Sequence, residues 1–103
     1  MKTYYLYILY SASSDKYYIG HSWNYKERLI HHNTDDKNTF TSKHKPWILK
    51  AVFEIGNDRG EALKVEKFIK KQKSRNLLQQ LIDSDFVPKG RLAQLVRVPH
   101  VRD

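Results

Sequence analysis

The fold is decided by residues 16–32, KYYIGHSWNYKERLIHH, where a strand pattern changes to a helix pattern within a few residues. The aromatic and β-branched run that ends at Gly20 is typical of a short strand. Asn24, followed three residues later by Glu27, has the form of a helix N-terminus with a reciprocal cap. This signal predicts a helix that runs to about His32.

The side chains of the same stretch suit a phosphate. Arg28 and His32 are four residues apart, so they lie on one side of the predicted helix. A guanidinium offers a charged fork to phosphate oxygens, and the neighbouring hydroxyls and histidines offer further hydrogen bonds. We therefore expect an anion-binding site near this helix.

A second strand, which pairs with the strand ending at Gly20, is predicted just before residue 16. Residues 4–10, YYLYILY, are apolar and aromatic enough for a strand buried on both faces. The turn formers that follow, SASSD, join the two strands into a hairpin. With residues 11–14 as the loop, Tyr7 lies directly opposite Tyr18. Directly opposed residues share one face of a sheet, so the two phenols are expected side by side.

Three more elements are predicted after a polar connection at residues 33–46. They are a strand at 47–55, a helix at about 59–71 that begins at Asp58, and a helix at 75–82 that begins at Ser74. Alternation along the strand places on one face Leu49, Ala51, Phe53 and Ile55. The order strand–strand–helix–strand–helix–helix indicates an α/β protein of the α+β type, with a small, mainly antiparallel three-stranded sheet flanked by helices.

Glu66 occupies an unusual position in the second predicted helix. It lies inside the apolar arc, flanked by Ala62, Leu63 and Ile69. A carboxylate on the buried side is costly unless something positive meets it there. A core salt bridge, for example with Lys70 one turn on, and a metal ion both satisfy that requirement.

Composition narrows the class of protein. The 103 residues carry a formal net charge of +8, which favours a polyanionic partner, nucleic acid first. The chain has no cysteine, which excludes disulfide-linked partners and cysteine zinc sites and fits a cytoplasmic protein. Four tyrosines in the N-terminal apolar run argue against a signal peptide, and no segment approaches the ~20 apolar residues that span a bilayer. We expect a cytoplasmic protein without a membrane partner.

The ordered motifs resemble those of the GIY-YIG nuclease superfamily. The likeness rests on Tyr5-Leu6-Tyr7, Tyr18-Ile19-Gly20, Arg28, His32 and Glu66, and covers roughly residues 3–82. It is greatest to the small single-domain bacterial members, which are related to the catalytic module of the excision-repair nuclease UvrC. The first motif departs from the family pattern because it lacks its glycine.

The resemblance implies a divalent-metal-dependent endonuclease that hydrolyses phosphodiester bonds in DNA, in repair or recombination. Tyr7 would be the general base, with its pKa lowered by a nearby guanidinium and metal ion. Tyr18 would orient water or phosphate, Arg28 would bind the non-bridging oxygens, and His32 would share proton transfer or bind phosphate. Glu66 would hold one Mg²⁺ or Mn²⁺, bound mainly together with substrate. A non-catalytic nucleic-acid-binding module and a protein-interaction domain are the alternatives.

A set of basic side chains is expected to contact the nucleic-acid backbone without reading sequence, with DNA favoured over RNA. Its members are Lys43, Lys45, Lys67, Lys70, Lys71, Lys73 and Arg75. A solubilising surface is the alternative explanation for these charges. Trp23 and Trp47 are interpreted as packing residues rather than platforms for stacked bases.

The chain divides by pattern into a nuclease-like domain at residues 1–82 and an irregular tail at residues 83–103. The tail carries two of the three prolines and shows no strand or helix period. Its stretch LAQLV back-translates to TTAGCTCAGTTGGTT, which resembles the D-arm of a transfer-RNA gene. One interpretation is therefore that the tail has no selected function.

Overall fold

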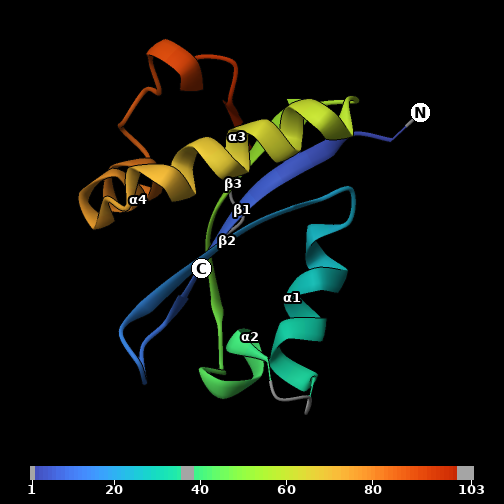
Figure 1. Cartoon of the computed structure of the whole chain (residues 1–103), viewed down its shortest axis with the longest axis vertical. Helices are drawn as coiled ribbons and strands as arrows, with labels where there is room; N and C mark the ends of the chain where they lie inside the picture. The colour runs from blue at the N-terminus through green and yellow to red at the C-terminus, as the bar shows by residue number, and fades with distance from the viewer. Residues whose placement is uncertain (1, 36–38, 100–103) are drawn as a thin grey trace.

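The computed structural model describes residues 2–35 and 39–99, which form a four-stranded antiparallel sheet with helices on both faces (Figure 1). The strands lie in the order β2-β1-β3-β4, so β2 is an edge strand. Along the chain the elements are β1 (Tyr4–Ser11), β2 (Lys16–Ser22), α1 (Tyr25–Thr34), α2 (Phe40–Lys43), β3 (Ile48–Gly56), α3 (Arg59–Gln72), α4 (Arg75–Ile82), the 3₁₀ turn η1 (Gly90–Leu92) and β4 (Val96–Arg97). The α+β class predicted from sequence is confirmed.

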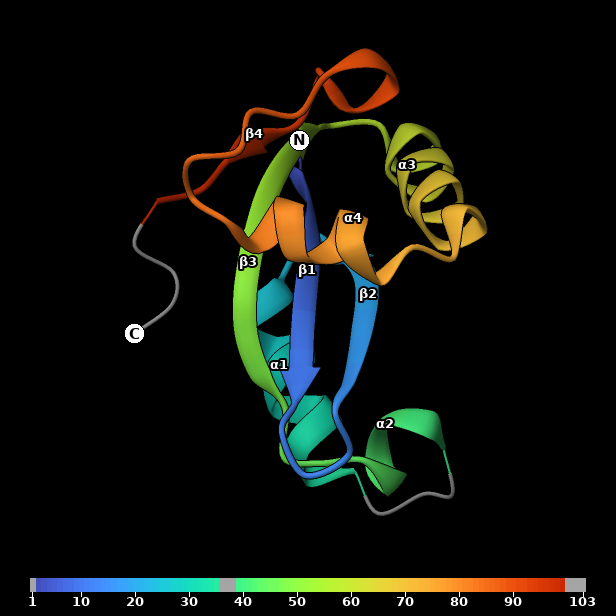
Figure 2. The ribbon, with the colours of Figure 1, turned by 90° about the vertical axis from the view of Figure 1, so that its left-hand side faces the viewer.

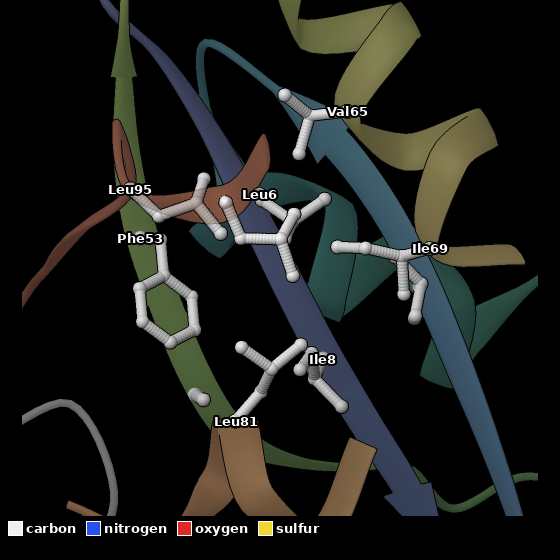
Figure 3. Packing of buried hydrophobic residues seen from close by; sticks show 10 residues of the cluster. Leu6, Ile8, Phe53, Val65, Ile69, Leu81 and Leu95 are labelled. Carbon is white, nitrogen blue, oxygen red and sulfur yellow. The ribbon is translucent and has the colours of Figure 1, made fainter. Parts of the chain in front are cut away.

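The sheet is covered on its two faces by different helices. Figure 2 shows α4 crossing in front of the strands, with α3 beside it and α1 behind them. On the α3 and α4 face, the apolar core includes Leu6, Ile8, Val65, Ile69 and Leu81 (Figure 3). On the α1 face, a smaller cluster is built from Tyr7, Leu9, Trp47 and Val52. As predicted, β1 is buried on both faces, because alternate side chains of a central strand enter opposite cores.

The hairpin differs from the prediction in its register. Tyr7 pairs with Gly20, and Tyr18 pairs with Leu9. The turn occupies residues 12–15, one position later than expected, and ends at Asp15 in the left-handed region (φ 51°). Moving a loop by one residue shifts the strand pairing by two. Since side chains alternate with period two, the two phenols still lie on the same face of the sheet.

The predicted face of β3 is wrong at Leu49. A bulge interrupts the pairing with β1: Ile8 pairs with Ala51 and the next residue, Leu9, pairs with Leu49. The extra residue between them reverses the alternation, so Leu49 packs on the α1 side with Tyr7 and its neighbours. The other predicted members of the face, from Ala51 onward, share one face as expected, and that face is the α3 side.

Within the described residues the sheet has four strands, so the prediction of three is wrong. The added strand is β4, which pairs with β3 and comes from the tail that was expected to be irregular. Leu92 and Leu95, each 5% exposed, pack into the core, and Figure 3 shows Leu95 beside Phe53. A two-residue strand is too short to produce a period in the sequence. The domain boundary after residue 82 stays a prediction.

The helix starts were predicted correctly. The side chain of Asn24 accepts a hydrogen bond from the Glu27 amide, while Asp58 and Ser74 cap α3 and α4 in the same way. Within the polar connection, the described residues include the last turn of α1 and the short helix α2, and residues 36–38 lie outside the description. Over the described part of the chain, every helix is too short or too polar to cross a membrane.

Candidate active site

Gly20 allows the phenol of Tyr7 to lie across the edge strand. The two residues are a cross-strand pair, and both are buried. A Cβ placed on Gly20 would come within 2.6 Å of the Tyr7 Cζ atom and nearer still to its hydroxyl. Real Cβ atoms do not approach so closely, so only glycine leaves room for the ring here. The glycine of the YIG motif is thus a packing requirement of the tyrosine on the neighbouring strand.

A cleft of about 620 Å³ opens at this point of the edge strand. Four of the five predicted catalytic residues line it: Tyr7, Tyr18, Arg28 and Glu66. They come from both faces of the sheet. The phenols and the guanidinium belong to the α1 face, whereas Glu66 belongs to α3 on the other face. The two halves meet around Gly20, where β2 has no side chain to separate them.

His32 lies behind the cleft and contacts Tyr7. Its Nε2 atom is 3.1 Å from the Tyr7 hydroxyl, its exposure is only 3%, and its Nδ1 atom has no hydrogen-bond partner among the described residues. Burial, followed by repulsion from Arg28 and His31, lowers the pKa of His32 to about 4. His32 is therefore neutral at pH 7, and its ring is available to accept the hydroxyl proton of Tyr7.

Burial also governs the ionisation of Tyr7. It raises the pKa of the phenol to about 12, and this effect exceeds the lowering produced by the hydrogen bond and positive charge of Arg28. The expected net fall of this pKa is thus wrong for the protein alone, although the effect of the guanidinium itself has the expected direction. Arg28 acts as expected but is outweighed by the buried position of the ring, which is 1% exposed.

Both carboxylate oxygens of Glu66 have basic partners. His21 Nδ1 lies 2.7 Å from Oε1, and Lys70 Nζ lies 2.8 Å from Oε2. The predicted contact with Lys70 is present, and the His21 contact was missed. The signal for it was strand alternation: His21 follows Gly20, so it projects from the opposite face of β2, toward α3.

The donor set suits a hydrated divalent ion. Over residues 2–35 and 39–99, no three His, Asp or Glu side chains gather into a metal cluster. Glu66 lines the cleft with a side chain that is 14% exposed, and Mg²⁺ or Mn²⁺ commonly binds through one carboxylate together with waters and substrate phosphates. Lys70 is about half exposed, so its ammonium group can turn into solvent without being left buried and unpaired. Glu66 can therefore release Lys70 and bind a metal ion instead.

The cleft also contains residues that sequence reasoning did not single out for it. Lys2 and Arg59 add positive charge to its lining. Trp23 is 50% exposed and lines the same cleft, with Lys2 Nζ 4.2 Å from its ring centroid. Trp47 is buried as expected, whereas Trp23, which was interpreted as a packing residue, leaves half of its surface exposed. These residues are far apart in sequence, so only the fold shows that they are neighbours.

The predicted basic residues are spread over several surfaces. Lys70 pairs with Glu66 at the cleft, and it lines a second hollow together with Lys73 and Arg75. Three others lie exposed on helices outside both hollows, namely Lys43 on α2 and Lys67 and Lys71 on α3. Lys45 donates to the backbone carbonyl of Asp35 at 3.2 Å. The structure therefore brings only part of this set near the cleft.

The α+β domain thus carries phenols, a guanidinium and a carboxylate at the cleft beside its edge strand. The chain belongs to the GIY-YIG family, because the GIY-YIG catalytic domain matches residues 3–79, well over half of its length. The resemblance seen in the sequence is thus confirmed. Members of the family are typically endonucleases that use divalent metal ions, so the fold implies a nucleic-acid substrate. A search of curated proteins gave no significant match.

Proposed function

We propose that this protein is a divalent-metal-dependent endonuclease that hydrolyses phosphodiester bonds in DNA, with a role in repair or recombination. One observation supports this most strongly. Arg28, Tyr7 and Glu66 come from opposite faces of the sheet and line a single open cleft around Gly20. A purely structural glutamate would not need to share a cleft with an exposed guanidinium and a buried phenol.

In this proposal Arg28 and Glu66 have separate roles at the phosphate. Arg28 is exposed on the cleft and binds the non-bridging oxygens, whose charge increases in the transition state. Glu66 holds one Mg²⁺ or Mn²⁺, bound mainly with substrate. When bound, such an ion would neutralise charge on the phosphate and make the attacking water more acidic. Tyr18 lines the same cleft and orients water or phosphate.

Proton transfer is proposed to run through Tyr7 to His32. With a pKa of about 12, a resident tyrosinate is scarce at pH 7. The phenol avoids that state if its oxygen accepts a proton from the attacking water while its own proton passes to His32 Nε2, 3.1 Å away. Arg28 is one cause of the low pKa of His32. A phosphate bound to Arg28 offsets its charge and makes His32 a better proton acceptor.

A non-catalytic nucleic-acid-binding module is the second candidate. The engagement of both Glu66 oxygens by His21 and Lys70 favours it, because a carboxylate with two basic partners is stable without a metal ion. In that case the cleft would bind phosphate without hydrolysing it.

Cleavage assays separate the two candidates. The protein is incubated with single-stranded, duplex, nicked, flapped and branched DNA and with RNA, with Mg²⁺ or Mn²⁺ added or withheld. Arg28→Ala and Glu66→Gln are compared with Glu61→Gln, an exposed change on the same helix. Metal-dependent cleavage lost in the first two variants only supports the nuclease. Salt-sensitive binding without cleavage on any substrate supports the module, and the absence of salt-sensitive binding contradicts both.

A further inference from the structure

A second hollow of about 490 Å³ lies beside the catalytic cleft. The two share Tyr18 in their linings, and Lys70 lines the hollow while its ammonium group contacts Glu66 in the cleft. The Lys70 ammonium also lies 5.5 Å from the Tyr18 ring centroid, so both residues stand at the boundary. A polymer that leaves the cleft past Lys70 would therefore enter the hollow.

An exposed aromatic ring forms part of this hollow. Phe40, the first residue of α2, is 48% exposed, although burial of so large an apolar side chain is normally favourable. Its position is held by neighbouring rings: the centroids of Tyr18, Trp47 and His44 lie 6.3, 6.0 and 4.8 Å away. Because these contacts already order the ring, a flat ligand that stacks on it loses little further conformational freedom.

The charge of the hollow is positive. Among its described lining residues are the cations Lys16, Lys70, Lys73 and Arg75, against a single acid, Asp15. Asp15 is ion-paired with Arg75. An occupant of this hollow should therefore carry negative charge together with a flat apolar surface. A nucleotide with a free base has both properties, since its phosphate is anionic and each base face can stack on an aromatic ring.

We propose that the hollow binds an unpaired base, and the phosphate beside it, from the strand whose scissile phosphate occupies the cleft. This assignment rests on the proposed function for the path of the strand. In a duplex the bases are stacked and paired, and exposing one costs a few kcal/mol. The hollow therefore gives the enzyme a preference for DNA with a single-stranded segment, such as a flap, gap or branch, over blunt duplex.

Binding without divalent metal tests the site independently of catalysis. Fluorescence anisotropy gives the affinity for a labelled single strand and for a blunt duplex of the same length at one low salt concentration. Phe40→Leu keeps an apolar side chain but removes the ring, and Ile30→Ala alters an exposed apolar residue on α1 outside the hollow. We expect Phe40→Leu to weaken single-strand binding about five- to tenfold, at the lower end of one stacked base. Duplex binding should stay within twofold, and Ile30→Ala should change neither.

The assignment is overturned if Phe40→Leu binds the single strand like the unchanged protein, or if it weakens both substrates equally. Should Phe40→Leu unfold at a lower temperature than Ile30→Ala, the unchanged protein provides the deciding measurement. The fluorescent base 2-aminopurine is placed in turn at each position of the single strand, and binding should alter its emission at a stacked position. An emission unchanged at every position refutes the site. If cleavage occurs but no base binds in the hollow, the base site is refuted and the nuclease proposal is not. If a base stacks in the hollow but no DNA is cleaved, the nuclease proposal is refuted and the base site is not.

Discussion

The substitution Gly20→Ala tests the packing on which the cleft depends. The new methyl group would stand 2.6 Å from the Tyr7 Cζ atom, where ordinary contact begins at 3.4 Å. The ring, or the strand that carries Gly20, must therefore shift by at least about 0.8 Å, because the hydroxyl lies nearer still than Cζ. Tyr7 has little room to move, because it is 1% exposed and belongs to the same buried cluster as Trp47 and Val52.

This overpacking sets the expected loss of stability. An extra methyl group in a well-packed core costs about 1–3 kcal/mol, which lowers the melting temperature of a domain of this size by about 5–20 °C. A shift of the ring also displaces the Tyr7 hydroxyl from its 3.1 Å contact with His32. If the nuclease proposal holds, a displacement of this size lowers kcat/KM for DNA cleavage up to about 100-fold.

Thermal and urea unfolding measure the first effect, and a matched glycine provides the control. Gly60 is exposed near the start of α3, where the nearest described atom to a Cβ would be Oδ1 of the exposed Asp58 side chain, at 3.1 Å. Gly60→Ala should be neutral or stabilise the protein by up to about 1 kcal/mol. In a Tyr7→Leu background, Gly20→Ala should cost much less than in the unchanged protein. Equal melting temperatures for Gly20→Ala and the unchanged protein would show that the reasoning is wrong.

Three further predictions concern other parts of the molecule. The pKa of His32 is about 4 in the folded protein and near 6.5 in the unfolded chain, so the unfolded chain binds more protons between these pH values. The free energy of unfolding, measured with urea, should therefore fall by about 2 kcal/mol from pH 7 to pH 5. His32→Gln should not show this fall. His21→Ala should lower kcat about tenfold and raise the Mn²⁺ concentration needed for cleavage, because His21 positions the carboxylate of Glu66. DNA affinity should stay unchanged. His31→Ala, which alters an exposed histidine, should change neither kcat nor the Mn²⁺ requirement. Leu95→Ala should reduce the free energy of unfolding by about 2–4 kcal/mol because the tail belongs to the core, whereas Val87→Ala, 67% exposed, should change it by less than about 0.5 kcal/mol.

The predictions that succeeded depend on neighbours in sequence. The caps at Asn24, Asp58 and Ser74 join atoms only a few residues apart, so the sequence shows both partners of each hydrogen bond. The burial of β1 on both faces follows from the composition of one short segment. The family could likewise be recognised, because the motif residues keep a fixed order and spacing along the chain.

The predictions that failed depend on how distant segments meet. The hairpin register depends on which residues of β1 and β2 pair across the turn, and the face of Leu49 depends on a bulge in the pairing of β1 with β3. β4 was missed because its pairing with β3 is specified by the partner strand rather than by its own two residues. The raised pKa of Tyr7 was missed because burial is a property of the assembled core, whereas the nearby charge of Arg28 could be inferred from the helix.

By itself the sequence determined the order of the strands and helices up to residue 82, apart from the short helix α2, and the set of candidate groups. The reason is that short-range hydrogen bonds and side-chain periodicity depend on residues close together in the chain. Only the tertiary structure decided that Glu66 reaches the phenols from the other face of the sheet, that His21 holds it there, and that an open aromatic hollow lies next to them. The physical reason is that each of these features requires atoms from several elements at one point in space. Their proximity follows from packing around the edge strand at Gly20, which periodicity within a single element does not encode.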